Sequence, residues 1–136
     1  MKSLKEKIQL VVDIYKSGDL LEAEQACKEL INENSKVAFL YNLLGLILAG
    51  QNKFGQAIKY YEQGLKIDPT FAIIYNNLGL LFFDQQTEES IKKAENYYKQ
   101  SISVDKKIPE PYINLGSLYN SLYRYEESID CYKESK

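Results

Sequence analysis

The chain has 136 residues, the length of one ordinary domain, and 45% of them are hydrophobic, so the composition favours a folded core over disorder. Its 17 basic and 19 acidic residues give a net charge of −2, which argues against a nucleic-acid-binding surface or one for anionic membranes. Histidine is absent, which removes the commonest general base and the commonest metal ligand.

The N-terminal segment carries charges of both signs, and Asp13 interrupts the apolar run that follows it. A secretory signal needs an uninterrupted apolar stretch after its basic residues, so this segment is not typical of one. No stretch reaches the length of a membrane-spanning helix. We therefore expect a cytoplasmic protein that does not bind a membrane.

One four-residue pattern recurs three times along the chain. Tyrosine, leucine, glycine and a large apolar residue follow one another at helical spacing, beginning at Tyr41, Tyr75 and Tyr112. The step from Tyr41 to Tyr75 is 34 residues and the step to Tyr112 is 37. A period of this length is typical of a solenoid built from copies of one two-helix unit. Solenoids of this kind present long surfaces that bind other chains.

The first copy, residues 4–37, is degenerate. Lys7, Leu10, Val11 and Ile14 stand where tyrosine, leucine, glycine and an apolar residue are expected, although the pattern recovers from Gly18 onward. Atypical repeats are common at the ends of solenoids.

The second copy, residues 38–71, predicts two helices. Apolar residues at helical spacing predict the first helix over 38–50 and the second over 54–67. Pro69 ends the second helix, because proline has no N–H to donate and disfavours helical backbone in the residue before it.

The third copy, residues 72–108, has three extra residues within 84–89. They form either a longer turn or an extra helical turn at the start of the second helix. Thr87 is predicted to cap that helix, since Glu88 and Glu89 would then suit its first turn. Two interpretations stay open: a tolerated insertion and a loop that contacts a partner.

Each first helix contains a glycine, which costs about 1 kcal/mol relative to alanine. Its recurrence at Gly45, Gly79 and Gly116 predicts a packing role. We expect each glycine to contact the small residue of its own helix pair. The small residues recur with matching steps and are Ala23, Ala57, Ala94 and Ser128.

The fourth copy, residues 109–136, is incomplete. Its second helix would have to reach residue 136 to match the second copy, and no polar helix follows to cover the last apolar face. Two interpretations stay open: the chain belongs to a longer array, or its last helix pairs with another chain.

These residues resemble the signature of the tetratricopeptide repeat (TPR) family, with Tyr-x-x-Leu-Gly in the first helix followed by Phe54, Ala57, Tyr61 and Pro69. The resemblance covers nearly the whole chain. It implies an all-α, right-handed solenoid of antiparallel helix pairs, which forms a single array over 1–136 with about three and a half repeats.

The resemblance also implies a non-enzymatic scaffold that binds a peptide or a segment of another protein in its concave groove, without a cofactor. The first helices of such repeats line the groove. The candidate binding residues are those that face away from the second helices: Phe39, Asn42, Ile73, Asn76, Asn77, Leu80, Phe83, Asn114, Ser117 and Asn120.

Asparagine side chains would orient the bound segment. An amide both donates and accepts, so it can pair with a peptide backbone whatever side chains the peptide has. Asn77 and Asn114 hold matching places in adjacent repeats, similar to an asparagine ladder by which another family member grips extended peptide, and Leu43 interrupts the ladder. The alternative is that these amides are only solvated.

A second TPR class holds the acidic tails of heat-shock chaperones between lysine, arginine and asparagine side chains. No cation stands at the matching positions here, so two carboxylates would find no charged partner. We therefore expect no binding of chaperone tails. The positions, in two registers, are Ile8, Val12, Leu43, Ile73 and Asn77, or Asn42, Leu46, Asn77, Glu110 and Asn114.

Two other functions compete with peptide binding. The chain could form a homo-oligomer through the apolar face of its last helix, or it could be the targeting domain of a longer enzyme. The tyrosines mostly recur at sites of repeat packing, which argues against base stacking on nucleic acid. Cys27 and Cys131 are expected to be free thiols, because the ends of an array lie farther apart than the roughly 7 Å that a disulfide allows.

Overall fold

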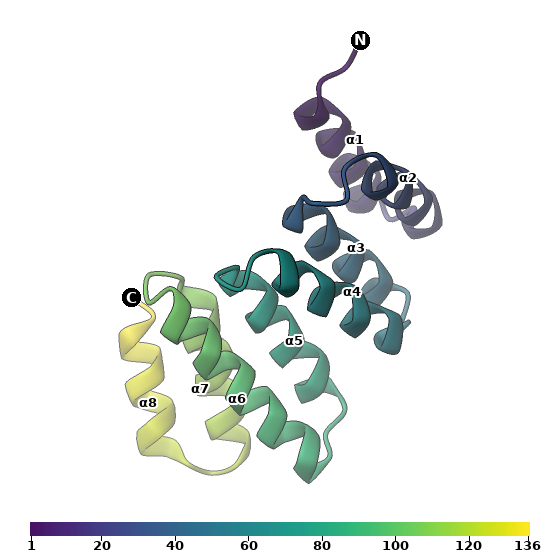
Figure 1. Cartoon of the computed structure of the whole chain (residues 1–136). Coiled ribbons are helices and arrows are strands. Elements are labelled where there is room, and N and C mark those ends of the chain that lie inside the picture. The colour runs from purple at the N-terminus through teal and green to yellow at the C-terminus, as the bar shows by residue number, and fades with distance from the viewer. The chain divides into compact units, whose positions relative to one another are not determined.

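The computed structural model describes all 136 residues and contains eight α-helices and no β-strand. The helices pair in chain order into four antiparallel hairpins (Figure 1). They form two compact units, Met1–Pro69 and Thr70–Lys136, each with two hairpins. The all-α prediction is confirmed, while the repeat limits, the single array and its handedness stay predictions. The helices are α1 (Leu4–Ser17), α2 (Leu20–Glu33), α3 (Ala38–Gly50), α4 (Phe54–Ile67), α5 (Ala72–Asp84), α6 (Glu88–Val104), α7 (Pro109–Ser121) and α8 (Tyr125–Glu134).

The turn inside each hairpin has the same backbone form. The residue before the cap of the second helix has a positive φ in all four turns, at Gly18 (94°), Asn52 (62°), Gln86 (56°) and Tyr123 (61°). Only glycine adopts this conformation without steric cost, and asparagine tolerates it better than most residues. The turn therefore ends the first helix and reverses the chain within a few residues.

The helices begin and end close to the residues that the apolar periodicity predicts. The bounds of α3 and α4 match the predicted 38–50 and 54–67. At the start of α1, Ser3 and Glu6 form a capping box in which each side chain accepts a hydrogen bond from the other residue's backbone N–H at 3.2 Å. Neither α3 nor α4 has a side-chain cap, so their ends depend on the turn and on packing.

The three extra residues of the third repeat lengthen a helix and leave the turn unchanged. Helix α6 has 17 residues, whereas α2 and α4 have 14 each. The connections 51–53 and 85–87 have the same length. Thr87 caps α6 as predicted, in a capping box with Ser90. The insertion is thus an extra helical turn at the start of α6, which excludes an extended contact loop.

The recurring glycines lie against tyrosine rings. A Cβ at Gly79 would lie 2.5 Å from the ring of Tyr98, and one at Gly116 would lie 2.9 Å from the ring of Tyr132. Gly45 faces Tyr61 in the same way. The prediction that the small residue is the closest partner is therefore wrong, since the tyrosine four residues later takes that place. Of the small residues, Ser128 does touch its glycine, donating from Oγ to the Gly116 carbonyl at 2.9 Å.

The first repeat holds a different pair of residues at these two places. Val11 replaces the glycine and Cys27 replaces the tyrosine, and both are buried. The Cys27 thiol donates to the Leu40 carbonyl at 3.4 Å, and burial raises its pKa to about 12. Both Cys27 and Cys131 are free, as predicted. A small second-helix residue accompanies the larger first-helix residue, which keeps the total volume of the pair similar.

A buried carboxylate joins the two hairpins of the first unit. Glu24 on α2 accepts hydrogen bonds from Lys28 Nζ at 2.7 Å, Gln51 Nε2 at 2.7 Å and Lys53 Nζ at 3.2 Å. Its residue exposure is 7%. The Lys28 hydrogen bond, opposed by burial and assisted by Gln51 and Lys53, lowers the pKa of Glu24 to about 2. Glu24 is thus charged and fully partnered at neutral pH.

Candidate binding surface

In the second unit, α5 and α7 lie next to each other and present apolar side chains to solvent. Ile73 and Leu80 on α5 are 45% and 38% exposed, and Ile113 on α7 is 43% exposed. Ser117 and Asn120 on α7 are also exposed. Helical spacing places these residues on one side of each helix, and we call them, with Asn76 and Asn114, the α5–α7 face.

Two predicted binding residues are bonded to each other on this face. Asn114 Nδ2 donates to Asn76 Oδ1 at 2.9 Å, which links α7 to α5. Asn76 is buried and Asn114 is half-buried. The bond uses one of the two N–H groups of Asn114 and leaves its second N–H as a donor and its oxygen as an acceptor. Asn114, oriented by the buried Asn76, can therefore still offer one donor and one acceptor to a peptide backbone.

Two other candidate asparagines, Asn42 and Asn77, are as buried as Asn76. Asn42 and Asn77 are 6% and 8% exposed, and each already has a partner in the fold. Asn114 bonds to Asn76 and not to Asn77, the residue that holds the matching place in the adjacent repeat. Of the two ladder asparagines, Asn77 and Asn114, only Asn114 is accordingly accessible.

The remaining candidates differ in exposure. Phe39 is 43% exposed on α3 of the first unit. Phe83 is half-buried, because it packs against the core cluster that contains Tyr98 and Leu118. Ser117 Oγ lies 3.2 Å from the hydroxyl of Tyr132 on α8, so the serine is held in place by its own hairpin. Phe83 thus packs mainly into the core beneath the α5–α7 face. Phe39 is exposed and available for apolar contact.

The ten candidate residues include no ionisable side chain. The chain also contains no cluster of three or more side chains that could hold a metal ion. None of its helices has both the length and the apolar character to cross a membrane. Chemically, the candidate surface offers apolar contact and amide or hydroxyl hydrogen bonds.

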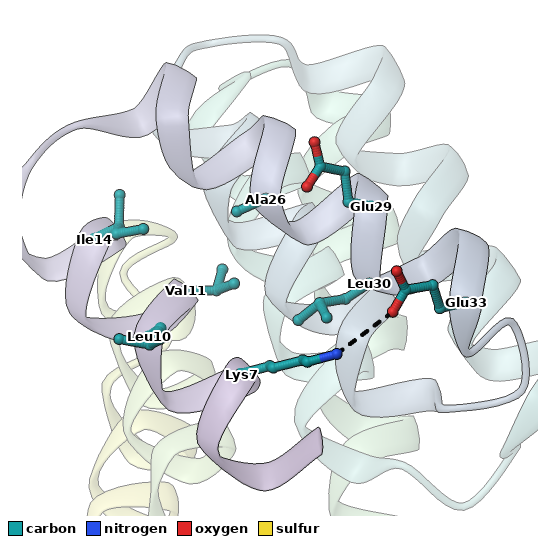
Figure 2. A pocket seen from close by; sticks show the side chains of 8 residues that line it. All are labelled: Lys7, Leu10, Val11, Ile14, Ala26, Glu29, Leu30 and Glu33. Carbon is teal, nitrogen blue, oxygen red and sulfur yellow. Dashed lines mark ion pairs between the residues drawn. The ribbon is translucent and has the colours of Figure 1, made fainter. Parts of the chain in front are cut away.

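Sequence reasoning did not find the cleft between α1 and α2 (Figure 2), which is lined by residues of the degenerate first repeat. The available signal was the loss of two aromatic residues, because Lys7 and Ala26 stand where the second repeat has Tyr41 and Tyr60. It also missed the buried carboxylate Glu24, which follows the recurring small residue Ala23.

Known proteins resemble the chain in both sequence and fold. A family model described as TPR repeat matches residues 45–86, and one described as tetratricopeptide repeat matches residues 109–136. A curated relative from Pyropia yezoensis, uncharacterized protein ycf37, is 34% identical, with 60% of this chain and 47% of the relative covered. The chain therefore spans about half the length of that relative.

Solved structures of MamA share the fold. One matches with a TM-score of 0.81 and 19% identity over 98% of this chain and 76% of MamA. A second matches with a TM-score of 0.76 and 19% identity over 98% and 71% of the two chains. At these identities the likeness establishes the fold alone.

The hairpins, the glycine–tyrosine contacts and the two matching family models together show that the chain belongs to the tetratricopeptide repeat family. Its fold is the helical repeat of that family, which serves as a scaffold for protein–protein interaction.

Proposed function

We propose that the chain is a non-enzymatic scaffold that binds an extended segment of another protein along the α5–α7 face. The observation that carries this proposal is the bonded pair Asn76–Asn114 among the exposed side chains of Ile73, Leu80 and Ile113. Phe39 holds the place of Ile73 on α3 in the first unit and would supply apolar contact there, whereas Asn42, in the place of Asn76, is buried and already has a partner. A cytoplasmic location fits the two free thiols.

The apolar side chains would supply most of the affinity. Full burial of an isoleucine or leucine side chain contributes about 1.5–3 kcal/mol. A neutral hydrogen bond contributes about 0.5–1.5 kcal/mol net. The remaining donor and acceptor of Asn114 would therefore mainly fix the direction and register of the bound backbone. Ser117 and Asn120 would add hydrogen bonds farther along α7.

The neutral character of the surface supports an uncharged or mixed-sequence ligand. The α5–α7 face has no cation that could pair with an acidic tail. We therefore still expect that chaperone tails are not bound. Because no ionisable group takes part, affinity should change little with salt concentration.

Selection of peptides on the immobilised whole chain, followed by calorimetry, tests the proposal. We expect selected peptides to be rich in apolar residues and to bind Asn114→Ala about three- to tenfold more weakly, as the loss of one hydrogen bond implies. Asn96→Ala is the matched control, since Asn96 is an exposed asparagine on α6 of the same unit. Equal affinity for both variants would exclude the amide pair from binding.

Exposed apolar residues at the end of the second unit favour self-association as a second candidate function. The α7–α8 turn and α8 expose Leu122, Tyr123, Tyr125, Ile129 and Tyr132, and contiguous exposed apolar patches often mark interfaces. Sedimentation equilibrium over a hundredfold range of protein concentration tests this candidate. It predicts a mass that rises with concentration for the wild-type chain and not for Tyr123→Ser/Ile129→Ser. A monomer throughout would rule it out.

A further inference from the structure

A cleft of about 280 Å³ lies between α1 and α2 in the first unit. Figure 2 shows its lining, with Lys7, Leu10, Val11 and Ile14 on α1 and Ala26, Glu29, Leu30 and Glu33 on α2. Leu10, Val11, Ile14, Ala26 and Leu30 make its wall apolar. The cleft belongs to a different unit from the α5–α7 face and shares no residue with it.

The cleft exists because the first repeat lacks two aromatic rings. In the second repeat, the rings of Tyr41 on α3 and Tyr60 on α4 stack with centroids 6.4 Å apart. Counting back 34 residues, their places are held by Lys7 and Ala26. A methyl group and a flexible amine therefore stand where two rings fill the corresponding hairpin. The vacated space is apolar and of aromatic size.

The rim of the cleft is acidic. Lys7 Nζ reaches across from α1 to Glu33 Oε2 at 3.8 Å, as the dashed line in Figure 2 shows. Both side chains are well exposed, so the pair is loose and screened by water. Glu29 lines the cleft beside Leu30 and has no ion-pair partner. The Glu29 carboxylate can thus pair with a cationic side chain of a binding partner.

We infer that this cleft binds one aromatic side chain of another protein, phenylalanine or tyrosine, next to a lysine or arginine in that protein's sequence. A cavity of about 150 Å³ accommodates benzene, so the cleft has room for one ring. The ring takes the place of the missing tyrosines against Leu10, Ile14 and Leu30. The neighbouring cation pairs with Glu29 at the rim. Burial of the ring supplies most of the affinity, and the charge pair selects basic over acidic segments.

NMR titration of the ¹⁵N-labelled whole chain with three capped tripeptides tests this inference. The peptides are acetyl-Lys-Phe-Lys-amide, acetyl-Lys-Ala-Lys-amide and acetyl-Glu-Phe-Glu-amide. We expect the first to shift amide signals within 7–14 and 26–33 selectively. The second and third should bind at least fivefold more weakly. Equal affinities, no shift at millimolar peptide, or shifts confined to other residues would overturn the inference.

Substitutions at Ala26 and at Glu29 separate the role of the ring from that of the charge. Ala26→Tyr restores the residue of the second repeat, fills the cleft and should abolish the shifts. Ala26→Leu, a smaller filling, guards against misfolding of the tyrosine variant and should weaken binding at least threefold. Glu29→Gln should reduce the preference for the basic peptide over the acidic one, whereas Glu62→Gln on α4, outside the cleft, should leave it unchanged.

A second copy of the chain is the competing occupant. In that case the amide signals within 7–14 and 26–33 would shift when the protein alone is concentrated from micromolar to millimolar. Such a shift, with no further effect of the basic aromatic peptide, would contradict the inference. Unchanged signals on concentration, followed by peptide-dependent shifts, are the expected result.

Discussion

The hydroxyl of Tyr119 on α7 donates a 2.7 Å hydrogen bond to Glu95 Oε2 on α6 and so joins the two hairpins of the second unit. Lys99 Nζ lies 3.1 Å from the same oxygen, and the Arg124 guanidinium lies over the Tyr119 ring. Burial acts to raise the pKa of Glu95, but the hydrogen bonds of Tyr119 and Lys99 with the nearby cations lower it overall.

Glu24 holds in the first unit the place that Glu95 holds in the second. Both carboxylates directly follow the recurring small residue, Ala23 or Ala94, and both reach residues at or near the turn of the next hairpin. Each unit thus contains one carboxylate that joins its first hairpin to its second. The family signature does not include this contact, and it gives both units a comparable internal connection.

Two tyrosine substitutions test this connection by comparison. Tyr119→Phe removes a hydrogen bond to a charged acceptor and should lower the free energy of unfolding by about 1–2 kcal/mol. The hydroxyl of Tyr98 is buried without a hydrogen-bond partner, so Tyr98→Phe should leave stability unchanged or raise it by up to about 1 kcal/mol. Urea unfolding of both variants measures the difference. An equal loss in both would contradict the assigned role of Tyr119.

The Glu24 cluster predicts a second stability difference. Glu24→Gln keeps the shape of the side chain and removes its charge, which should lower the free energy of unfolding by about 1–2 kcal/mol at pH 7. The Lys28 and Lys53 side chains are 43% and 39% exposed, and this keeps the cost below that of a fully buried pair. Glu29→Gln on the same helix is the control and should change stability by less than about 0.5 kcal/mol.

The same carboxylate makes stability depend on pH. The pKa of Glu24 is about 2 in the folded chain and 4.5 as an ordinary glutamate. Its charged form is favoured by folding, so its contribution is present above pH 4.5 and is lost as the pH falls toward 2. The stability difference between wild type and Glu24→Gln should therefore shrink between pH 7 and pH 3. A difference that stays constant over this range would show that the charge is not the cause.

The glycine–tyrosine contact predicts an unusual effect of alanine in a helix. Gly79→Ala gains about 1 kcal/mol of helix propensity, but its Cβ would lie 2.5 Å from the Tyr98 ring. Overpacking of this kind costs about 1–3 kcal/mol, so we expect a net loss of stability in thermal unfolding. Gly55→Ala on α4 meets nothing within 4 Å and should be neutral or stabilising. Stabilisation by both changes would refute the close contact.

Much of the fold follows from the sequence because repeat period and helix signals are local. The bounds of α3 and α4, the Thr87 cap and the free cysteines were all predictable. The partner of Gly79 was not, because Ala94 and Tyr98 recur with the same period and lie on one side of α6. Spacing shows that two positions belong together, but packing decides which of them is closest.

The candidate site was less predictable for a similar reason. Asn76 and Asn77 are neighbours that point about 100° apart on α5, and only the packing of α5 on α7 selects Asn76 as the partner of Asn114. The exposure of Ile73, Leu80 and Phe39 followed from helical spacing. The α1–α2 cleft required a comparison of Lys7 and Ala26 with Tyr41 and Tyr60 across two helices at once.

Substitution of Leu80 tests the central claim, binding along the α5–α7 face, most directly. Calorimetry with a peptide selected on the whole chain would compare wild type, Leu80→Glu and Leu21→Glu, where Leu21 is an exposed leucine on α2 at 61% exposure. Loss of leucine burial and introduction of a charge should weaken binding to Leu80→Glu at least tenfold, with Leu21→Glu within twofold of wild type. Wild-type affinity in Leu80→Glu would contradict the claim that this face is the binding surface.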